Sequence, residues 1–171
     1  FFYNAGNAAG SPLSNVEQAV QQLGCSSQDS IVSVDGSLLW VSNSFKGGYT
    51  VYKLESVSSL QEVATPEIQR LLTAEGTSIS STTCFPIRIG GKSLYILNLA
   101  SAGRTFCYDL KDDLWTEFEA AAGSAVWPIV SAYQHLNTLV CQHATNGWLY
   151  LLSPTVYQDD STNFTVLARL S

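Results

Sequence analysis

Residues 29–54, DSIVSVDGSLLWVSNSFKGGYTVYKL, decide the fold of this chain. They contain three short apolar, β-branched or aromatic runs, at 31–34, 38–42 and 49–54. Asp35-Gly36 separates the first two runs, and Lys46-Gly47-Gly48 separates the last two. Glycine reaches the positive φ that tight hairpin turns require, so both glycine-containing segments predict turns. The stretch is therefore predicted to form a three-stranded antiparallel meander.

Two later stretches repeat this plan. The second meander is predicted to have strands at 82–89, 93–99, 105–110 and 114–119. The third is predicted to have strands at 129–134, 138–142, 148–153 and 164–170. Tyr52, Tyr108 and Tyr150 lie in the third strand of each unit, and Trp40, Ile96 and Val140 lie near the centre of each second strand. Four-stranded antiparallel units that recur about every 40–50 residues are typical of propeller blades.

The predicted fold class is all-β, with antiparallel four-stranded meanders in a β-propeller-like arrangement and two short helices. Residues 1–28 form an N-terminal segment and residues 29–171 the propeller-like domain, with about three blade-like units, at about 29–60, 79–119 and 127–170. A β-sandwich is the alternative, because it also consists of many short strands with turn signals. Three units are too few to close a propeller, so further sequence or symmetry mates are expected to supply the rest.

Two short helices interrupt the strands. The first is predicted at 15–23, because Ser14 and Glu17 form a capping box. The second is a helical insertion at 65–75, which Thr65-Pro66-Glu67 opens with an N-cap, a proline at the first position and an acidic first turn. Residues 55–60 are predicted to be a polar connection, with the fourth strand of the first unit obscured where the helix enters.

Composition excludes several classes of protein. The 171 residues are 46% hydrophobic and only 13% charged, which indicates a folded domain with a sizeable core. The net charge of −6 offers no basic surface for sequence-specific nucleic-acid binding. No apolar run reaches the roughly 18 residues of a membrane span, so no membrane partner is expected. The chain contains no methionine, which leads us to expect an internal piece of a longer protein.

The four cysteines, Cys25, Cys84, Cys107 and Cys141, are widely spaced and form no C-x-x-C pair. Cys84, Cys107 and Cys141 lie in apolar strand-like runs, where a free thiol behaves as a small hydrophobe, so reduced and buried cysteines are expected over disulfides or a metal site. Their spacing matches no zinc motif. No cofactor or metal is therefore predicted.

No catalytic site is assigned either. His135 is expected in a hairpin turn and His143 just past a strand, and neither has a nucleophile or carboxylate at a recognised spacing. The acidic clusters are Asp109, Asp112 and Asp113 in one hairpin and Asp159 and Asp160 in another loop. Neither cluster matches a calcium-binding loop, and aspartate is common in turns because its side chain caps the backbone.

The tryptophans are Trp40, Trp115, Trp127 and Trp148. They are expected to pack between sheets, and the alternative is a platform for stacking sugars. That platform would need two or three of them exposed on one face.

Four segments resemble the packaged-DNA stabilisation proteins, which are tail accessory or hub factors of short-tailed phages. The segments are LGCSSQDSIVSVDGSLLWVSNSFKGGYTVYKL at 23–54, VATPEIQRLL at 63–72, IGGKSLYILNLASAGRTFCYDLKDDLWTEF at 89–118 and NGWLYLLS at 146–153. The sequence departs from the family at Ala64-Thr65, where members usually carry Ser-Thr. The resemblance implies a β-propeller-like structural protein of the virion, made in the bacterial host cytoplasm and carrying no catalytic residues.

The resemblance further implies a homo-oligomeric ring at the portal-proximal end of the tail. There the ring would help close the exit channel for packaged DNA and contact other tail and portal proteins. Two other functions remain open from sequence: a carbohydrate- or receptor-binding propeller of a tail, and a propeller hydrolase. The first requires an exposed aromatic shelf, and the second requires at least two converging carboxylates.

Overall fold

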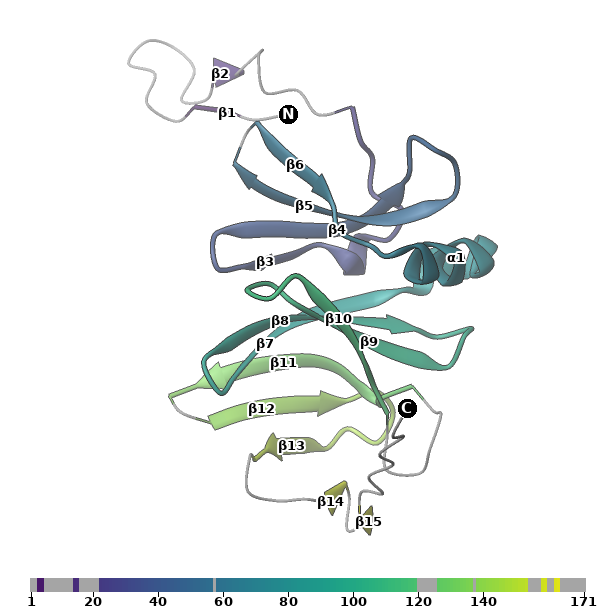
Figure 1. Cartoon of the computed structure of the whole chain (residues 1–171). Coiled ribbons are helices and arrows are strands. Elements are labelled where there is room, and N and C mark those ends of the chain that lie inside the picture. Colours follow the sequence, from purple (N-terminus) through teal and green to yellow (C-terminus); the bar gives the residue numbers. More distant parts are fainter. Residues whose placement is uncertain are drawn as a thin grey trace, which may run out of the picture.

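A computed structural model describes residues 3–4, 14–15, 22–56, 58–119, 126–136, 138–153, 158–159 and 162–163. Three antiparallel sheets are stacked one above another, with helix α1 beside the junction of the upper two (Figure 1). We call them the first, second and third sheets in chain order. The fold is all-β and propeller-like, with about three blades, as the sequence predicts.

The first sheet has the order β3-β4-β5-β6. Its strands are β3 (Val32–Val34), β4 (Ser37–Asn43), β5 (Tyr49–Ser56) and β6 (Ser59–Glu62). Asp35 and Gly36 have φ values of 48° and 77°, so the predicted hairpin turn is confirmed. The predicted polar connection at 55–60 is wrong, because this segment completes β5 and begins β6. β6 escaped the sequence pattern because it is a mostly polar, partly exposed edge strand.

The second sheet has the order β7-β8-β9-β10 and confirms all four predicted strands. They are β7 (Thr83–Ile89), β8 (Lys92–Leu99), β9 (Arg104–Asp109) and β10 (Leu114–Phe118). Pro86 lies within β7. Proline lacks an N–H, and β7 tolerates it because β7 is an edge strand paired on one side only.

The third sheet has three described strands, β11 (Ile129–His135), β12 (Thr138–His143) and β13 (Leu149–Leu152). The predicted fourth strand at 164–170 lies outside the described residues. Two separate pairs of two-residue strands join β1 (Tyr3–Asn4) to β2 (Ser14–Asn15), and β14 (Gln158–Asp159) to β15 (Thr162–Asn163).

Helix α1 (Pro66–Ala74) confirms the predicted insertion. Its N-cap Thr65 accepts a hydrogen bond from Ile68 N at 3.4 Å, and Pro66 opens the helix. Two short 3₁₀ helices are η2 (Gln28–Ser30) and η3 (Gly76–Ser81). No helix in the described part of the chain is long and apolar enough to cross a membrane.

The helix predicted at 15–23 is wrong at both ends. Ser14 and Asn15 pair with Asn4 and Tyr3 in an antiparallel bridge, and Leu23 is not helical. At Ser14, pairing between strands therefore overrides the local sequence signal for the start of a helix. Residues 16–21, including Glu17 of the predicted capping box, lie outside the described residues.

Apolar side chains form a core on each side of the second sheet. The core toward the first sheet includes α1, and its buried members are Val32, Val34, Leu39, Val41, Val51, Ile68, Leu72, Ile79, Tyr95, Leu97, Leu99, Phe106 and Tyr108. The core toward the third sheet consists of Phe85, Ile87, Leu94, Ile96, Cys107, Ile129, Leu139 and Cys141. A smaller cluster of Trp40, Tyr52 and Leu54 covers the far face of the first sheet.

The three repeated tyrosines occupy equivalent places. Tyr108 packs toward the first sheet, Tyr150 packs toward the second sheet, and Tyr52 lies on the face of the first sheet that points away from the second. Each tyrosine therefore faces the preceding side of its own sheet, and the stack has a direction. Their cross-strand partners are Trp40, Tyr95 and Cys141. Tyr95 and Cys141 each lie one residue before or after the predicted strand centres, Ile96 and Val140. Successive residues of a strand point to opposite faces of the sheet, so the predicted centres lie on the other face.

Candidate functional site

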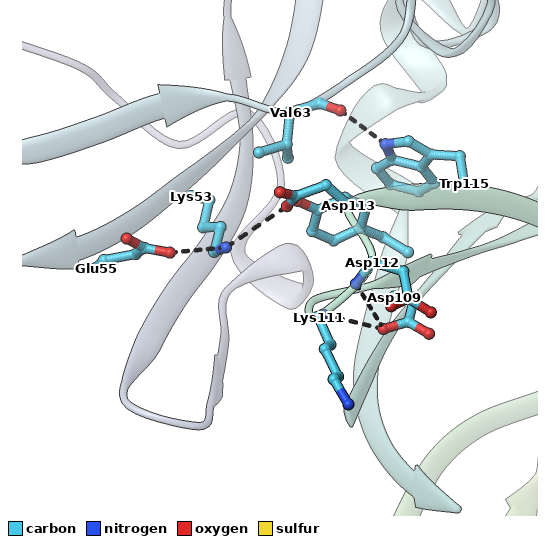
Figure 2. A network of polar contacts seen from close by, with 9 residues as sticks. Lys53, Glu55, Val63, Asp109, Lys111, Asp112, Asp113 and Trp115 are labelled. Atoms are coloured by element: carbon cyan, nitrogen blue, oxygen red, sulfur yellow. Dashed lines mark hydrogen bonds and ion pairs between the residues drawn. The ribbon is translucent and has the colours of Figure 1, made fainter. Parts of the chain in front are cut away.

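A network of polar contacts joins the first sheet to the second (Figure 2). Lys53 lies on β5 with its side chain only 7% exposed. Its Nζ is 2.8 Å from Glu55 Oε1 on the same strand and 3.8 Å from Asp113 Oδ1 in the turn between β9 and β10. Asp113 in turn accepts a 2.5 Å hydrogen bond from the Tyr108 hydroxyl. The network thus links a buried cation of one sheet to a core tyrosine of the next.

The tyrosine hydroxyl is held in its protonated form. Burial raises the pKa of Tyr108, and the hydrogen bond to Asp113 raises it further. Asp113 has a φ of 51°, a left-handed conformation that aspartate tolerates in tight turns. The β9–β10 turn is therefore shaped to place a carboxylate between Tyr108 and Lys53.

Removing the cation and removing its anions are predicted to have unequal effects. Lys53→Met is expected to change the free energy of unfolding by less than about 1 kcal/mol, because methionine can fill the same space among apolar neighbours. Glu55→Gln combined with Asp113→Asn leaves a buried ammonium without anions, and we expect a loss of about 2 kcal/mol. The cost stays moderate because both carboxylates are partly exposed. Urea unfolding at pH 7 measures both, and a larger loss for Lys53→Met would contradict the assignment.

Trp115 makes a second link between these sheets. Its indole Nε1 on β10 donates a 2.8 Å hydrogen bond to the Val63 carbonyl, which follows β6 (Figure 2). Its ring lies 5.1 Å from the ring of Tyr108 and 6.4 Å from that of Tyr95. The apolar ring packs on the second sheet while its polar atom reaches the first.

Glu75 fastens helix α1 to the second sheet. It follows the last turn of α1 and is 6% exposed. Its two carboxylate oxygens accept hydrogen bonds from the backbone N–H groups of Ala102 at 2.8 Å and Ser101 at 3.3 Å. A buried carboxylate thereby fixes the turn between β8 and β9.

Two further hydrogen bonds fix η2 and its N-cap residue Ser27. One runs from Ser27 to Thr82, which immediately precedes β7, and the other runs from Tyr95 on β8 to Ser30 of η2. The Ser27 hydroxyl donates to the Thr82 carbonyl at 2.6 Å. The hydroxyl of Tyr95, which is fully buried, donates to the Ser30 carbonyl at 3.1 Å and lies 3.0 Å from Cys84 Sγ. Burial raises the pKa of Tyr95 well above its ordinary value, so the hydroxyl stays a donor.

The contact between the second and third sheets uses neutral polar groups. Asn98 Nδ2 on β8 donates to the Ile129 carbonyl at 2.7 Å, and Asn98 Oδ1 accepts from Thr105 Oγ1 at 2.7 Å. Thr105 Oγ1 also accepts from Trp127 N at 2.9 Å. Satisfied buried networks of this kind fix one relative position of two packed elements.

Trp115 and Trp127 pack between sheets as expected, whereas Trp40 is buried on the face of the first sheet that points away from the second. Trp40 is 8% exposed and donates from Nε1 to the Gly24 carbonyl at 3.1 Å. Trp127 lies against Phe85 and Phe118. The packing prediction is wrong for Trp148, which is 62% exposed beside Tyr150. Trp148 falls in the irregular segment before β13, where strand alternation does not direct the side chain inward.

Neither histidine faces a catalytic partner that the described residues reveal. His135 is the exposed last residue of β11. His143 ends β12, and its Nδ1 accepts hydrogen bonds from the backbone N–H groups of Thr145 and Asn146, each at 3.2 Å. The imidazole of His143 thus caps the turn before β13, which is a structural role.

The carboxylates of Asp109 and Asp112 in the acidic hairpin are paired with a lysine of the neighbouring strand or with backbone N–H groups. Asp109 accepts a 2.5 Å hydrogen bond from Lys92 Nζ. It accepts two more from the backbone N–H groups of Lys111 and Asp112 (Figure 2). Lys92 also bonds Asp112 at 2.6 Å. No group of histidine, cysteine or acidic residues in the described ranges is arranged to hold a metal. Asp159 lies in β14, and Asp160 falls outside the described residues.

The stability of the hairpin is expected to depend on pH. The hydrogen bond from Lys92 lowers the pKa of Asp109 below its ordinary value. A lowered folded-state pKa contributes stability above the unfolded pKa, near 4, and that stability is lost as pH falls through the folded value. Asp109→Asn should therefore be less stable than wild type at pH 7 and lose less stability between about pH 5 and pH 2. Thermal unfolding across that pH range measures the loss of stability. Lys92→Met is expected to reduce this loss in the same way as Asp109→Asn. Variants that lose as much stability as wild type over this range would contradict the prediction.

All four cysteines are free thiols. Burial raises the pKa of Cys107 to about 12 and that of Cys141 to about 11, so both are unreactive at neutral pH. Cys84 is half-buried, and burial raises the pKa of its thiol as well. Cys25, which lies outside those apolar runs, is exposed and precedes the first sheet.

A hollow of about 210 Å³ lies where the first strands of the three sheets meet, and it is lined by Ser33, Val34, Pro86, Ile87, Arg88, Ala132, Tyr133, Gln134 and Leu139. Ligand sites for small molecules usually measure about 300–1,000 Å³. Arg88, the one cation among these lining residues, already pairs with Asp35. The hollow is too small and too neutral to indicate a substrate site.

Sequence reasoning missed Lys53, Glu75 and Asn98, which make these contacts. Lys53 and Asn98 each lie two residues after a buried strand residue, Val51 and Ile96, and so on the same inward face. A polar residue on an inward face was the available signal, because such a group is retained only with a partner. Glu75 gave no signal, since its partners lie on a distant turn.

Comparison with known proteins adds one match. The model of a phage stabilisation family, described as Bacteriophage P22 Gp10, beta-propeller, matches residues 1–157. A search of curated proteins finds no match. The described contacts serve to hold sheets together, and the matched family is one of phage structural proteins.

Proposed function

The chain belongs to the phage stabilisation family of P22 Gp10-like β-propellers, and on that premise we propose that it forms an oligomeric ring in the phage tail or neck. The ring contacts the portal and helps close the exit channel for packaged DNA. Its function is geometric and not enzymatic. The observation that carries the proposal is the family match over residues 1–157.

The contacts between the sheets support this function physically. Apolar cores lie on both faces of the second sheet, and hydrogen-bonded networks cross both junctions. Such a stack resists bending, because close-packed interiors have low compressibility and transmit strain. A plug beneath packaged DNA needs this rigidity.

The charge of the chain also suits a DNA exit channel. The net charge of −6 repels phosphate, so DNA would pass without being held. The partners are accordingly other tail and portal proteins, with no sequence-specific contact to DNA. The chain would act in the virion, after synthesis in the host cytoplasm.

A carbohydrate- or receptor-binding function is not favoured by the aromatic side chains. A sugar platform needs two or three exposed tryptophans on one face, and among the described residues only Trp148 is mostly exposed. A hydrolase is not favoured by the carboxylates. Glu117 pairs with Arg104, Asp109 pairs with Lys92, and Glu75 is taken up by backbone N–H groups.

Depletion of the protein during infection tests the proposed function. Phage particles assembled without it are expected to fill with DNA and then lose it, so that empty heads accumulate. Electron microscopy and nuclease-protected DNA per particle measure this loss. Particles that retain their DNA and lack only host adsorption would contradict the proposal and favour a receptor-binding module.

A further inference from the structure

The turn between β12 and β13 contains an asparagine followed by a glycine. Asn146 is the one asparagine of the sequence that precedes a glycine. Asn146 and Gly147 are both exposed. Gly147 has a φ of 71°, and a methyl group there would have no atom within 4 Å. Because glycine carries no side chain, the peptide nitrogen that follows Asn146 is open to approach by the Asn146 side chain.

The oxygen of the Asn146 side chain is fixed from one side. Asn146 Oδ1 accepts a 2.9 Å hydrogen bond from Trp148 N. This bond closes a turn in which the side chain mimics the backbone, so the side-chain carbonyl carbon is folded back toward the nitrogen of Gly147. Holding two reacting atoms close together lowers the barrier to their reaction. The same N–H would stabilise the negative charge that Oδ1 acquires when its carbon is attacked.

The nitrogen of the Asn146 side chain is fixed from the other side. Asn146 Nδ2 donates a 3.1 Å hydrogen bond to the hydroxyl of Tyr150. A phenolic hydroxyl also donates, so Tyr150 can supply a proton to this nitrogen as it leaves. Tyr150 is held in place by its pairing with Cys141 and by the core between the second and third sheets. His143 Nδ1 fixes the backbone of the turn by accepting from Asn146 N at 3.2 Å.

We propose that this turn converts Asn146 to aspartate or isoaspartate without an enzyme. A base from solvent removes the proton of Gly147 N, which then attacks Asn146 Cγ. The new N–Cγ bond forms, the Cγ–Nδ2 bond breaks, and Nδ2 leaves as ammonia after it takes up a proton. Water then hydrolyses one of the two C–N bonds of the cyclic imide, which gives aspartate or isoaspartate. No atom is oxidised or reduced.

The conversion changes the turn irreversibly. Either product adds a negative charge, and isoaspartate also lengthens the backbone by an extra carbon. β13 begins shortly afterwards, at Leu149, which pairs with Gln142 of β12. The modification therefore alters the loop that carries the exposed Trp148. It does not depend on the ring proposed above.

Time-resolved peptide mapping of the intact chain tests the proposal. The folded protein is incubated in mildly alkaline buffer, and mass spectrometry with fragmentation that separates aspartate from isoaspartate follows each asparagine. Asn43, which is exposed at the end of β4 and precedes a serine, is the internal control. Asn146 is expected to convert at least about tenfold faster than Asn43 because its reacting atoms are held together. An Asn146 that stays an amide, or that converts no faster than Asn43, would overturn the proposal.

Two comparisons separate the turn from the asparagine–glycine pair itself. The chain unfolded in urea keeps the pair and loses the turn, so Asn146 should convert more slowly there than in the folded chain. Tyr150→Phe keeps the packed ring and removes the hydroxyl, so the folded variant should convert about tenfold more slowly than wild type. In urea the variant and the wild type should convert equally. Folded wild type that converts no faster than unfolded chain, or a folded Tyr150→Phe that matches wild type, would show that the turn does not promote the reaction.

Discussion

Leu97→Ala is expected to lower the free energy of unfolding by about 3–5 kcal/mol. Leu97 lies on β8, is 0% exposed, and packs in the core between the first and second sheets. Truncation removes three buried carbons and leaves a cavity that two rigid sheets cannot close. Urea unfolding followed by tryptophan fluorescence measures the loss.

The matched control is Leu114→Ala on β10 of the same sheet. Leu114 is 56% exposed, so its truncation should cost less than about 1 kcal/mol. Hydrogen exchange adds a second readout. If the sheets unfold as one unit, Leu97→Ala should speed exchange in both the first and the second sheet. Faster exchange confined to the second sheet, or equal losses for the two leucines, would show that the sheets are not one cooperative stack.

Gly48→Ala is expected to cost about 2–4 kcal/mol, combining backbone strain with a steric clash. Gly48 ends the turn before β5 and has a φ of 77°. A methyl group there would clash with Thr73 Oγ1 of α1, which now accepts a 3.2 Å hydrogen bond from Tyr49 N. The substitution therefore strains the turn and displaces the helix from the sheet. Thermal or urea unfolding measures the loss.

Gly47→Ala provides an unusually close control. Gly47 also has a positive φ, of 92°, but a methyl group there would have no atom within 4 Å. It should therefore show only the backbone strain, about 1–2 kcal/mol. Thr73→Ala in the Gly48→Ala background should recover part of the loss, because it removes the hydroxyl that obstructs the methyl group. Equal losses at the two glycines would show that α1 does not pack closely on this turn.

The strands of the second sheet could be predicted from sequence for identifiable reasons. Glycine pairs mark its first turn and long apolar runs mark β8 and β9, so propensity and burial agree. The tyrosine repeat also proved structural, since Tyr52, Tyr108 and Tyr150 all face the preceding side of their sheets. Local signals were strongest for β8 and β9, which are buried on both faces.

The remaining features depend on contacts that the sequence pattern does not display. β6 is a short, mostly polar edge strand, and its residues show no alternation of buried and exposed positions. The capping box at Ser14 and Glu17 predicted a helix, yet pairing with Asn4 places Ser14 in a strand. Lys53 stands at an inward strand position, but its partner Asp113 becomes apparent only when the β9–β10 turn is brought against β5. Pairing with another segment of the chain decided each of these cases.

Cryo-electron microscopy of the tail vertex of the phage that encodes this chain tests whether the protein forms a ring at the portal. We expect the three-sheet stack to fit density in a ring beneath the portal, with several copies around the DNA exit channel. In each copy the inter-sheet contacts of Lys53 and Trp115 should be recognisable. Mature virions that lack the protein, or density for it only at a site remote from the portal and tail, would contradict the account.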